Sequence, residues 1–176
     1  MLSPLYRLAA ALVVTVAIGA SVASQMVQKT DTETPVLIGV TRAVEIAEAA
    51  LNANLLRADL NTRDDKLTYQ IDLAKAGEYF RVWIDAKDGE LVRADKPFSS
   101  NLWADLFDGR RLKAAATMPP VGPRLRALEA DVRGKVQHVR FDLDDNRAQY
   151  EIDVTTGAGT AELVLDALSG EQSPRR

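Results

Sequence analysis

The chain repeats itself, and this internal repeat limits its fold more than any other feature of the sequence. Shifting the sequence by 81 residues places residues 41–73 over residues 122–154 without a gap, and the match continues from residues 74–90 into residues 155–171. The coincident residues include Glu48 with Glu129, Tyr69 with Tyr150, Ile71 with Ile152, Asp85 with Asp166 and Gly89 with Gly170. A register kept over this length indicates one folding unit that is present twice.

Each copy predicts one helix followed by three strands. Apolar residues recur at helical spacing within residues 43–50 and again within residues 125–132. Period-two alternation of apolar residues then follows three times in each copy, with polar turns between the runs. One helix packed on a three- to four-stranded antiparallel sheet is the simplest closed arrangement for this order of elements. We therefore expect an α+β fold made of two tandem modules.

The repeat also sets the expected domain boundaries. The first module is predicted over residues 37–95 and the second, degenerate one over residues 123–172, with a short tail at residues 173–176. The intervening residues 96–122 contain a proline-rich end and predict an irregular linker. A module of about 60 residues is only marginally stable alone. We therefore expect the two modules to pack against each other or against the linker.

The N-terminal residues 1–23 are typical of an export signal or a membrane anchor. Arg7 gives a positive start, residues 8–23 carry no charge, and Ser21 and Ala23 place small residues where a signal peptidase would cut. An uncleaved anchor normally needs about 20 apolar residues. The prediction is a cleaved signal with a tethered N-terminus as the alternative, followed by a flexible linker over residues 24–36. Either alternative places the body of the protein outside the cytoplasm.

Composition excludes several classes of function. The net charge of −3 argues against a nucleic-acid binder, and the absence of cysteine excludes disulfides and thiolate metal sites. Residues 142–146 imitate the start of a calcium loop, but Arg147 stands where such a loop needs glycine. The one histidine, His138, has no motif partner and is expected at the surface. We expect no catalytic residues, no metal and no cofactor.

Several segments resemble the PepSY domain family. Residues 41–51 (TRAVEIAEAAL), a following Tyr-x-Ile strand, and residues 84–91 (IDAKDGEL) are similar to its helix, strand and closing hairpin. The second copy keeps LDALSGE at residues 165–171. Both copies depart from the family's threonine in that hairpin, where Asp88 and Ser169 stand instead.

The resemblance implies an extracytoplasmic, non-enzymatic module, because the family occurs in propeptides of thermolysin-like metallopeptidases and in many secreted or membrane-anchored bacterial proteins. We therefore expect a binding or regulatory module that acts on a protein partner, for which a peptidase or an envelope complex is the candidate. The alternative is a membrane-tethered structural or assembly component of an envelope complex. The membrane is expected to be contacted only through an uncleaved N-terminal segment.

Four residues are predicted to shape equivalent turns. Asp85 and Asp166 precede tight turns, in which an aspartate side chain commonly accepts backbone N–H groups of its own turn. Gly89 and Gly170 are placed to supply the positive φ that such turns require. These residues are interpreted as structural and not as a binding pair.

Five residues are candidates for a partner-binding surface. Tyr79, Arg81 and Trp83 alternate onto the strand face opposite the predicted core. Trp103 and Phe107 lie at helical spacing in the linker and predict either an exposed anchor or a plug between the modules. For Trp83 two interpretations stay open, namely recognition of a partner and burial between the two modules.

The second copy has smaller or acidic residues where the first has its aromatic ones: Thr160, Glu162 and Val164. Because large aromatic residues and arginine are enriched at interface hot spots, we expect the first copy to carry the recognition surface. The second copy is expected to support it.

Overall fold

The computed structural model describes residues 36–96, 109–145 and 147–175. Residues 1–23 and Trp103 and Phe107 of the linker lie outside the described residues. None of the helices in the described part of the chain is long and apolar enough to cross a membrane.

The elements follow the predicted order in both halves. The first half contains α1 (Val40–Leu51), β1 (Asn54–Arg63), β2 (Lys66–Lys75), β3 (Glu78–Asp85) and β4 (Leu91–Asp95). The second contains α4 (Gly122–Val132), β5 (Lys135–Asp144), β6 (Arg147–Thr156), β7 (Gly159–Asp166) and β8 (Gln172–Pro174), and α3 (Gly109–Ala116) lies between the halves. Each strand of the second half begins 81 residues after its counterpart. The expected mixed α+β class is confirmed.

The strands form one antiparallel sheet and not one sheet per half. Its order is β4-β3-β2-β1-β5-β6-β7-β8, so β1 and β5 join the halves edge to edge. We call this strand pair the seam. At the seam Ala58 faces Val139, its equivalent in the 81-residue shift, so an approximate two-fold axis passes through this pair. The joined edges pair backbone groups that two separate sheets would each leave open.

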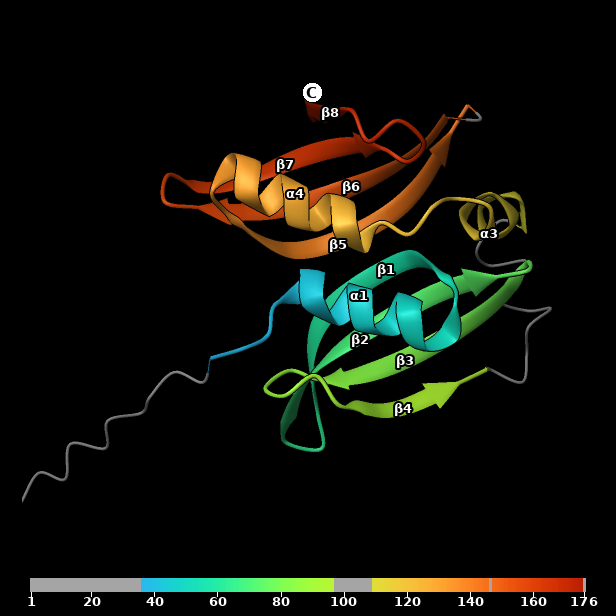
Figure 1. Ribbon diagram of the computed structural model, residues 1–176, viewed down its shortest axis with the longest axis vertical. Coiled ribbons are helices and arrows are strands. Elements are labelled where there is room, and N and C mark those ends of the chain that lie inside the picture. Colours follow the sequence, from blue (N-terminus) through green and yellow to red (C-terminus); the bar gives the residue numbers. More distant parts are fainter. Residues whose placement is uncertain (1–35, 97–108, 146, 176) are drawn as a thin grey trace, which may run out of the picture. The chain divides into compact units, whose positions relative to one another are not determined.

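The apolar face of the sheet lies under α1 and α4, which Figure 1 shows on the same side of the strands. The alternation in β2 and β6 points Ile71 and Ile152 into this core, where both are almost fully buried. From the helices, Val44 and Leu125 fill the same layer. The opposite face of the sheet, which we call the open face, carries the intervening polar residues.

Helix α3 covers part of the open face beside the seam. Its Arg111 lines a cavity with Tyr79 and Asp72, which alternate with the core residues of their strands and so point away from α1. The buried residues of α3 are Leu112 and Ala115. The linker expected to be irregular over residues 96–122 therefore contains a helix, because its basic run has a small apolar stripe that can pack on the sheet.

A buried carboxylate ties the two halves together. Glu48 of α1 is 5% exposed and accepts hydrogen bonds from the backbone N–H groups of Leu55 at 3.3 Å, Val121 at 3.1 Å and Gly122 at 3.0 Å. Burial raises the pKa of Glu48, against the opposing effect of these hydrogen bonds. Its equivalent Glu129 accepts the N–H of Val136 at 2.9 Å. The shared contact anchors each helix to its first strand, and the other two contacts fix the start of α4 on α1.

Candidate partner-binding surface

Tyr79 lies on the open face but is not at the surface. Only 3% of it is exposed, and it shares a cavity with Arg111 of α3. Burial raises the pKa of the Tyr79 hydroxyl, and the nearby Asp72 carboxylate adds to the rise. The expectation that Tyr79 contributes to an exposed surface is therefore wrong, because the linker helix covers this part of the sheet.

Arg81 is held flat on the sheet by a neighbouring carboxylate. Its Nε donates to Asp72 Oδ1 at 2.7 Å and its Nη2 donates to Oδ2 at 3.1 Å. Asp72 is 4% exposed, whereas the Arg81 side chain is 26% exposed. This two-point pair satisfies the buried carboxylate. The same guanidinium stands over the Tyr79 ring at 5.6 Å from its centroid, and it does not line the hollow beside Trp83.

Trp83 is half-buried and lies between two arginines. The Arg63 guanidinium stands over its ring at 4.6 Å from the centroid, and that of Arg93 stands at 5.5 Å. Arg93 is also paired with Asp95 at 2.7 Å. Such contacts fix the orientation of an aromatic ring at the surface. Because β3 is separated from the seam by β2 and β1, Trp83 is not buried between the halves.

The ring forms one wall of a surface hollow of about 410 Å³, which we call the Trp83 hollow. It is lined by Arg63, Asp64, Lys66, Thr68, Trp83, Asp85, Glu90, Val92 and Arg93. Three cations and three carboxylates are thus present around one indole. The arrangement suits a partner that offers both an apolar contact and polar groups around it.

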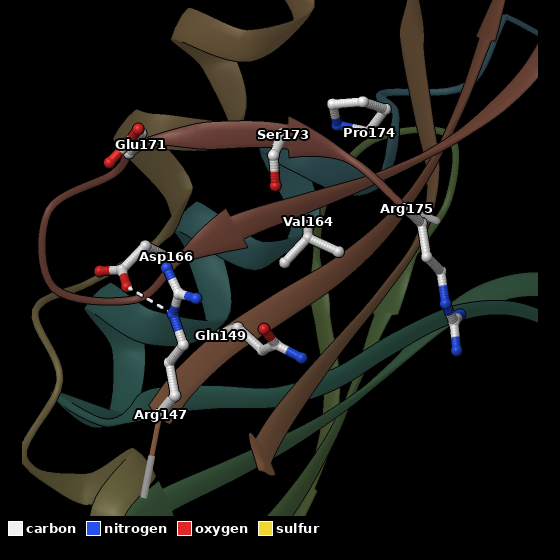
Figure 2. A pocket seen from close by; sticks show the side chains of 8 residues that line it. All are labelled: Arg147, Gln149, Val164, Asp166, Glu171, Ser173, Pro174 and Arg175. Carbon is white, nitrogen blue, oxygen red and sulfur yellow. Dashed lines mark ion pairs between the residues drawn. The ribbon is translucent and has the colours of Figure 1, made fainter. Parts of the chain in front are cut away.

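The second half has an equivalent hollow of about 420 Å³, which we call the Val164 hollow (Figure 2). It is lined by Arg147, Gln149, Val164, Asp166, Glu171, Ser173, Pro174 and Arg175. Seven of these eight residues stand 81 positions after a residue that lines the Trp83 hollow. Figure 2 shows Val164 in the middle of this hollow and Arg147 facing Asp166, to which it is paired at 3.8 Å. The repeat therefore places two related hollows on the open face.

The chemistry of the two hollows differs. Val164 replaces Trp83, and the positions of the two flanking arginines are taken by Asp144 and Pro174. Arg175 lines only the second hollow and is held by Glu151 at 2.9 Å. The aromatic centre with two cationic neighbours is therefore a property of the first half.

The turn residues make the local contacts described for such turns. Asp85 Oδ1 accepts the N–H of Lys87 at 2.8 Å, and Asp166 Oδ1 accepts the N–H of Leu168 at 3.0 Å. Gly89 and Gly170 have φ of 79° and 74°, which non-glycine residues rarely adopt. Hydrogen bonds led by the Ser169 N–H lower the pKa of Asp166. Both carboxyl groups are thus engaged by their own turns.

Sequence reasoning missed two partners in this region. Arg93 is the cross-strand neighbour of Trp83 in the β3–β4 pair, and a hairpin register drawn from Gly89 would have found it. His138 was expected at the surface, yet its Nδ1 lies 2.5 Å from Asp59 Oδ1 across the seam.

Within the described residues no group of three or more acidic or histidine side chains is placed to hold a metal ion.

Comparisons with known proteins identify the first half. Residues 37–95 match the PepSY family, described as peptidase propeptide and YPEB domain, so this segment is a PepSY domain. No curated protein matches the chain. Among solved structures, the chain is similar to a crystal structure of a candidate lipoprotein from Clostridium difficile 630, with 16% identity and a TM-score of 0.42. That similarity covers 80% of this chain and 93% of the other.

Proposed function

We propose that this protein is a non-catalytic, extracytoplasmic binding module that recognises a protein partner through the Trp83 hollow. The observation that carries the proposal is the half-buried indole of Trp83 between the guanidinium groups of Arg63 and Arg93. Tryptophan and arginine are the residues most enriched at energetic hot spots of interfaces. Stacking on two cations also holds the ring in place, which lowers the entropy lost on binding.

The location of the hollow supports the same proposal. It lies within residues 37–95, the segment that is a PepSY domain, and the family description includes peptidase propeptides. A peptidase is therefore the candidate partner, and regulation of its activity is the candidate role. We propose that residues 123–172 are a diverged second copy that supports the first, since its strands keep the 81-residue offset but its hollow lacks the aromatic centre.

Export is part of the proposal. The uncharged residues 8–23, with small residues before Ser24, favour a cleaved signal. The second candidate function is a membrane-tethered assembly component of an envelope complex, and it is favoured by the same uncharged segment if that segment is retained. N-terminal sequencing of the mature protein distinguishes the two. A chain that begins at Ser24 supports a soluble module, and a chain that retains residues 1–23 supports the tethered component.

Affinity capture tests the recognition surface. The wild type, the Trp83→Ala variant and the Val164→Ala variant are immobilised and exposed to envelope extract, and captured proteins are identified by mass spectrometry. Val164→Ala is the matched control, because it changes the equivalent position of the second hollow. A partner retained by the wild type and by Val164→Ala but lost by Trp83→Ala supports the proposal. A partner captured equally by all three variants contradicts it.

A further inference from the structure

The two outer strands of the sheet, β4 and β8, differ in what can pair with them. They stand at opposite ends of the strand order, so each has one neighbouring strand among the described residues (Figure 1). An outer strand presents unpaired backbone N–H and C=O groups, with which a strand of another protein can pair. Natural proteins protect such edges with very short strands or with proline. We therefore compared the two edges for this protection.

Strand β8 is short, with three residues, and a proline protects it. The Arg175 N–H donates to Glu162 O at 3.2 Å, so the backbone of Arg175 faces β7. The backbone groups of successive strand residues alternate in direction, so those of Pro174, which stands opposite Leu163, point out of the sheet. Proline has no N–H group. A further strand therefore finds no donor at this position.

Strand β4 has five residues and keeps its outward donor. The Asp85 N–H donates to Glu90 O at 2.8 Å, so the backbone of Asp85 faces β4. By alternation the backbone of Val82 faces the other way, toward β2. Ala94 stands opposite Val82, so its own N–H and C=O point out of the sheet. Ala94 is also exposed, and its N–H is therefore accessible to another strand.

The repeat makes this difference a matched comparison. The 81-residue shift relates Val82 to Leu163, so Ala94 and Pro174 occupy equivalent positions of the two outer strands. The fold accommodates a proline at this position in the second half. The first half has a residue there that can donate a hydrogen bond outward.

Two exposed apolar side chains accompany the open edge of β4. Leu91 is 39% exposed and Val92 is 57% exposed, whereas the 81-residue shift relates them to the polar residues Gln172 and Ser173. Leu91 stands opposite Ile84, a core residue, so its side chain lies on the face that the helices cover. Val92 lines the Trp83 hollow on the open face. An added strand can thus cover an apolar side chain on each face of the sheet.

The charges at this edge are compensated. Arg93 is paired with Asp95 at 2.7 Å, and Lys96 is paired with Glu78 at 2.7 Å. The edge therefore attracts neither an acidic nor a basic strand in particular. Backbone pairing and apolar contact remain as the sources of recognition.

We propose that β4 pairs with an extended segment of the protein partner, which adds a strand to this end of the sheet. The segment bonds to the backbone of Ala94, and its apolar side chains cover Leu91 and Val92. The proposal rests on the proposed function, since Val92 and Arg93 of β4 also line the Trp83 hollow. In this mode of recognition the main-chain hydrogen bonds provide affinity and the side chains provide specificity.

A phage library of random short peptides supplies the probe. The library is selected on the full chain, and synthetic copies of the selected peptides are titrated against it by calorimetry. We expect these peptides to be rich in β-branched and aromatic residues, which favour strands. Hydrogen exchange of the Ala94 amide, followed by NMR, should slow when a peptide binds. A library that yields no binding peptide would overturn the proposal.

The variant Ala94→Pro closes the edge in the way that Pro174 closes β8. It should weaken the binding of the selected peptides by about tenfold or more, because the outward N–H is lost. The matched control Ala94→Thr keeps the N–H and should leave the affinity within about threefold. Both variants should melt within about 4 °C of the wild type, since this N–H makes no bond inside the sheet. Equal affinity of the wild type and Ala94→Pro would contradict pairing at β4.

Peptides methylated at alternate backbone nitrogens give a test that needs no variant. A paired strand turns the amides of every second residue toward its neighbour. Methylation of one alternate set should therefore abolish binding to the wild type, and methylation of the other set should preserve it. Undiminished binding of both methylated forms would overturn the proposal even if Ala94→Pro does not fold.

The variant Trp83→Ala separates this proposal from the proposed function. Loss of the captured partner by both Ala94→Pro and Trp83→Ala supports both proposals. Loss by Ala94→Pro alone supports pairing at β4 and counts against the Trp83 hollow, whereas loss by Trp83→Ala alone supports the hollow and overturns pairing at β4. A second copy of the chain is the rival occupant of the edge. A wild type that sediments as a dimer and an Ala94→Pro variant that sediments as a monomer would assign the edge to that copy and overturn the proposal.

Discussion

The two hollows on the open face have the same position in the repeat and nearly the same volume, yet only one has an aromatic centre. In the Trp83 hollow the indole lies between two guanidinium groups, whereas the Val164 hollow has a small aliphatic side chain at the equivalent position. The matching strands of the two halves therefore form similar hollows, and a few side chains give them different chemistry. Similar backbones thus do not imply similar binding, because the chemistry of a site depends on individual side chains.

The largest expected effect concerns the buried carboxylates of the two helices, Glu48 in α1 and Glu129 in α4, which make different numbers of hydrogen bonds. Replacing Glu48 by alanine leaves three buried N–H groups without their acceptor, whereas replacing Glu129 removes the acceptor of one. At about 1–3 kcal/mol for each unsatisfied group, Glu48→Ala should lower the free energy of unfolding by about 3 kcal/mol or more. Glu129→Ala leaves one such group and should lower it by about 1–3 kcal/mol, about a third of the loss in Glu48→Ala. Urea unfolding monitored by circular dichroism measures both, and equal losses would contradict the asymmetry.

The next effect concerns binding at the two hollows. Trp83→Ala should weaken partner binding by about 2 kcal/mol or more, which is the usual size of a hot-spot loss. Val164→Ala should change it by less than about 0.5 kcal/mol, because an isolated surface substitution rarely does more. Surface plasmon resonance with the captured partner gives both values. Thermal melting of Trp83→Ala serves as the control, since a variant that melts early would assign the loss to stability.

The pH dependence should have opposite signs at two carboxyl groups. Burial raises the pKa of Glu48, so the folded state holds its proton more tightly and the stability gained at low pH is lost as the pH rises through the raised pKa. Hydrogen bonds lower the pKa of Asp166, so its ionised carboxylate stabilises the folded state. This stabilisation is fully present above the ordinary pKa of 3.8 and is lost as the pH falls through the lowered pKa.

Melting curves from acidic to neutral pH check these signs. The wild type should melt at a higher temperature than Glu48→Gln at low pH, and this difference in melting temperature should shrink as the pH rises. The difference in melting temperature between the wild type and Asp166→Asn should shrink as the pH falls. Parallel curves for either pair would show that the carboxyl group does not change its proton affinity on folding.

The smallest effect is expected from adding the missing aromatic residue. Val164→Trp places an indole in the second hollow, but Asp144 and Pro174 stand where Arg63 and Arg93 flank Trp83. Without flanking cations the ring is not held, so we expect no gain in partner binding and a change in stability of less than about 0.5 kcal/mol. Titration calorimetry with the same partner checks this. A gain equal to the Trp83 contribution would show that the indole alone suffices.

Much of the fold could be predicted because its signals are periodic and repeated. The helical stripe that contains Val44 and the alternation through Ile71 are local patterns, and the second copy supports each of them at the same offset. The pairing of β1 with β5 has no such signal, since an edge strand does not reveal its neighbour. The hydrogen bond acceptor role of Glu48 toward Gly122 depends on that pairing and was equally hidden.

The candidate site was predicted only in part for a related reason. Alternation correctly separates the face of Trp83 from the core face, but it does not reveal what covers the remaining face. Tyr79 lies two residues before Trp83 on the same face and is buried, because α3 lies over that end of the sheet and not over Trp83. The sequence pattern predicts which face of the sheet a side chain points to. Whether that side chain is exposed depends on where a distant segment of the chain packs.

The seam has a consequence for how the halves depend on each other. Two identical proteins that pair through one strand about a two-fold axis form a homodimer whose stability falls on dilution. Here both partners belong to one chain, so the linker keeps each edge at a high effective concentration near the other whatever the protein concentration. An isolated first half would expose the edge of β1 and would have to find a second molecule to cover it. Joining the two halves in one chain removes that requirement, because β5 covers the edge of β1 whichever residues line the second hollow.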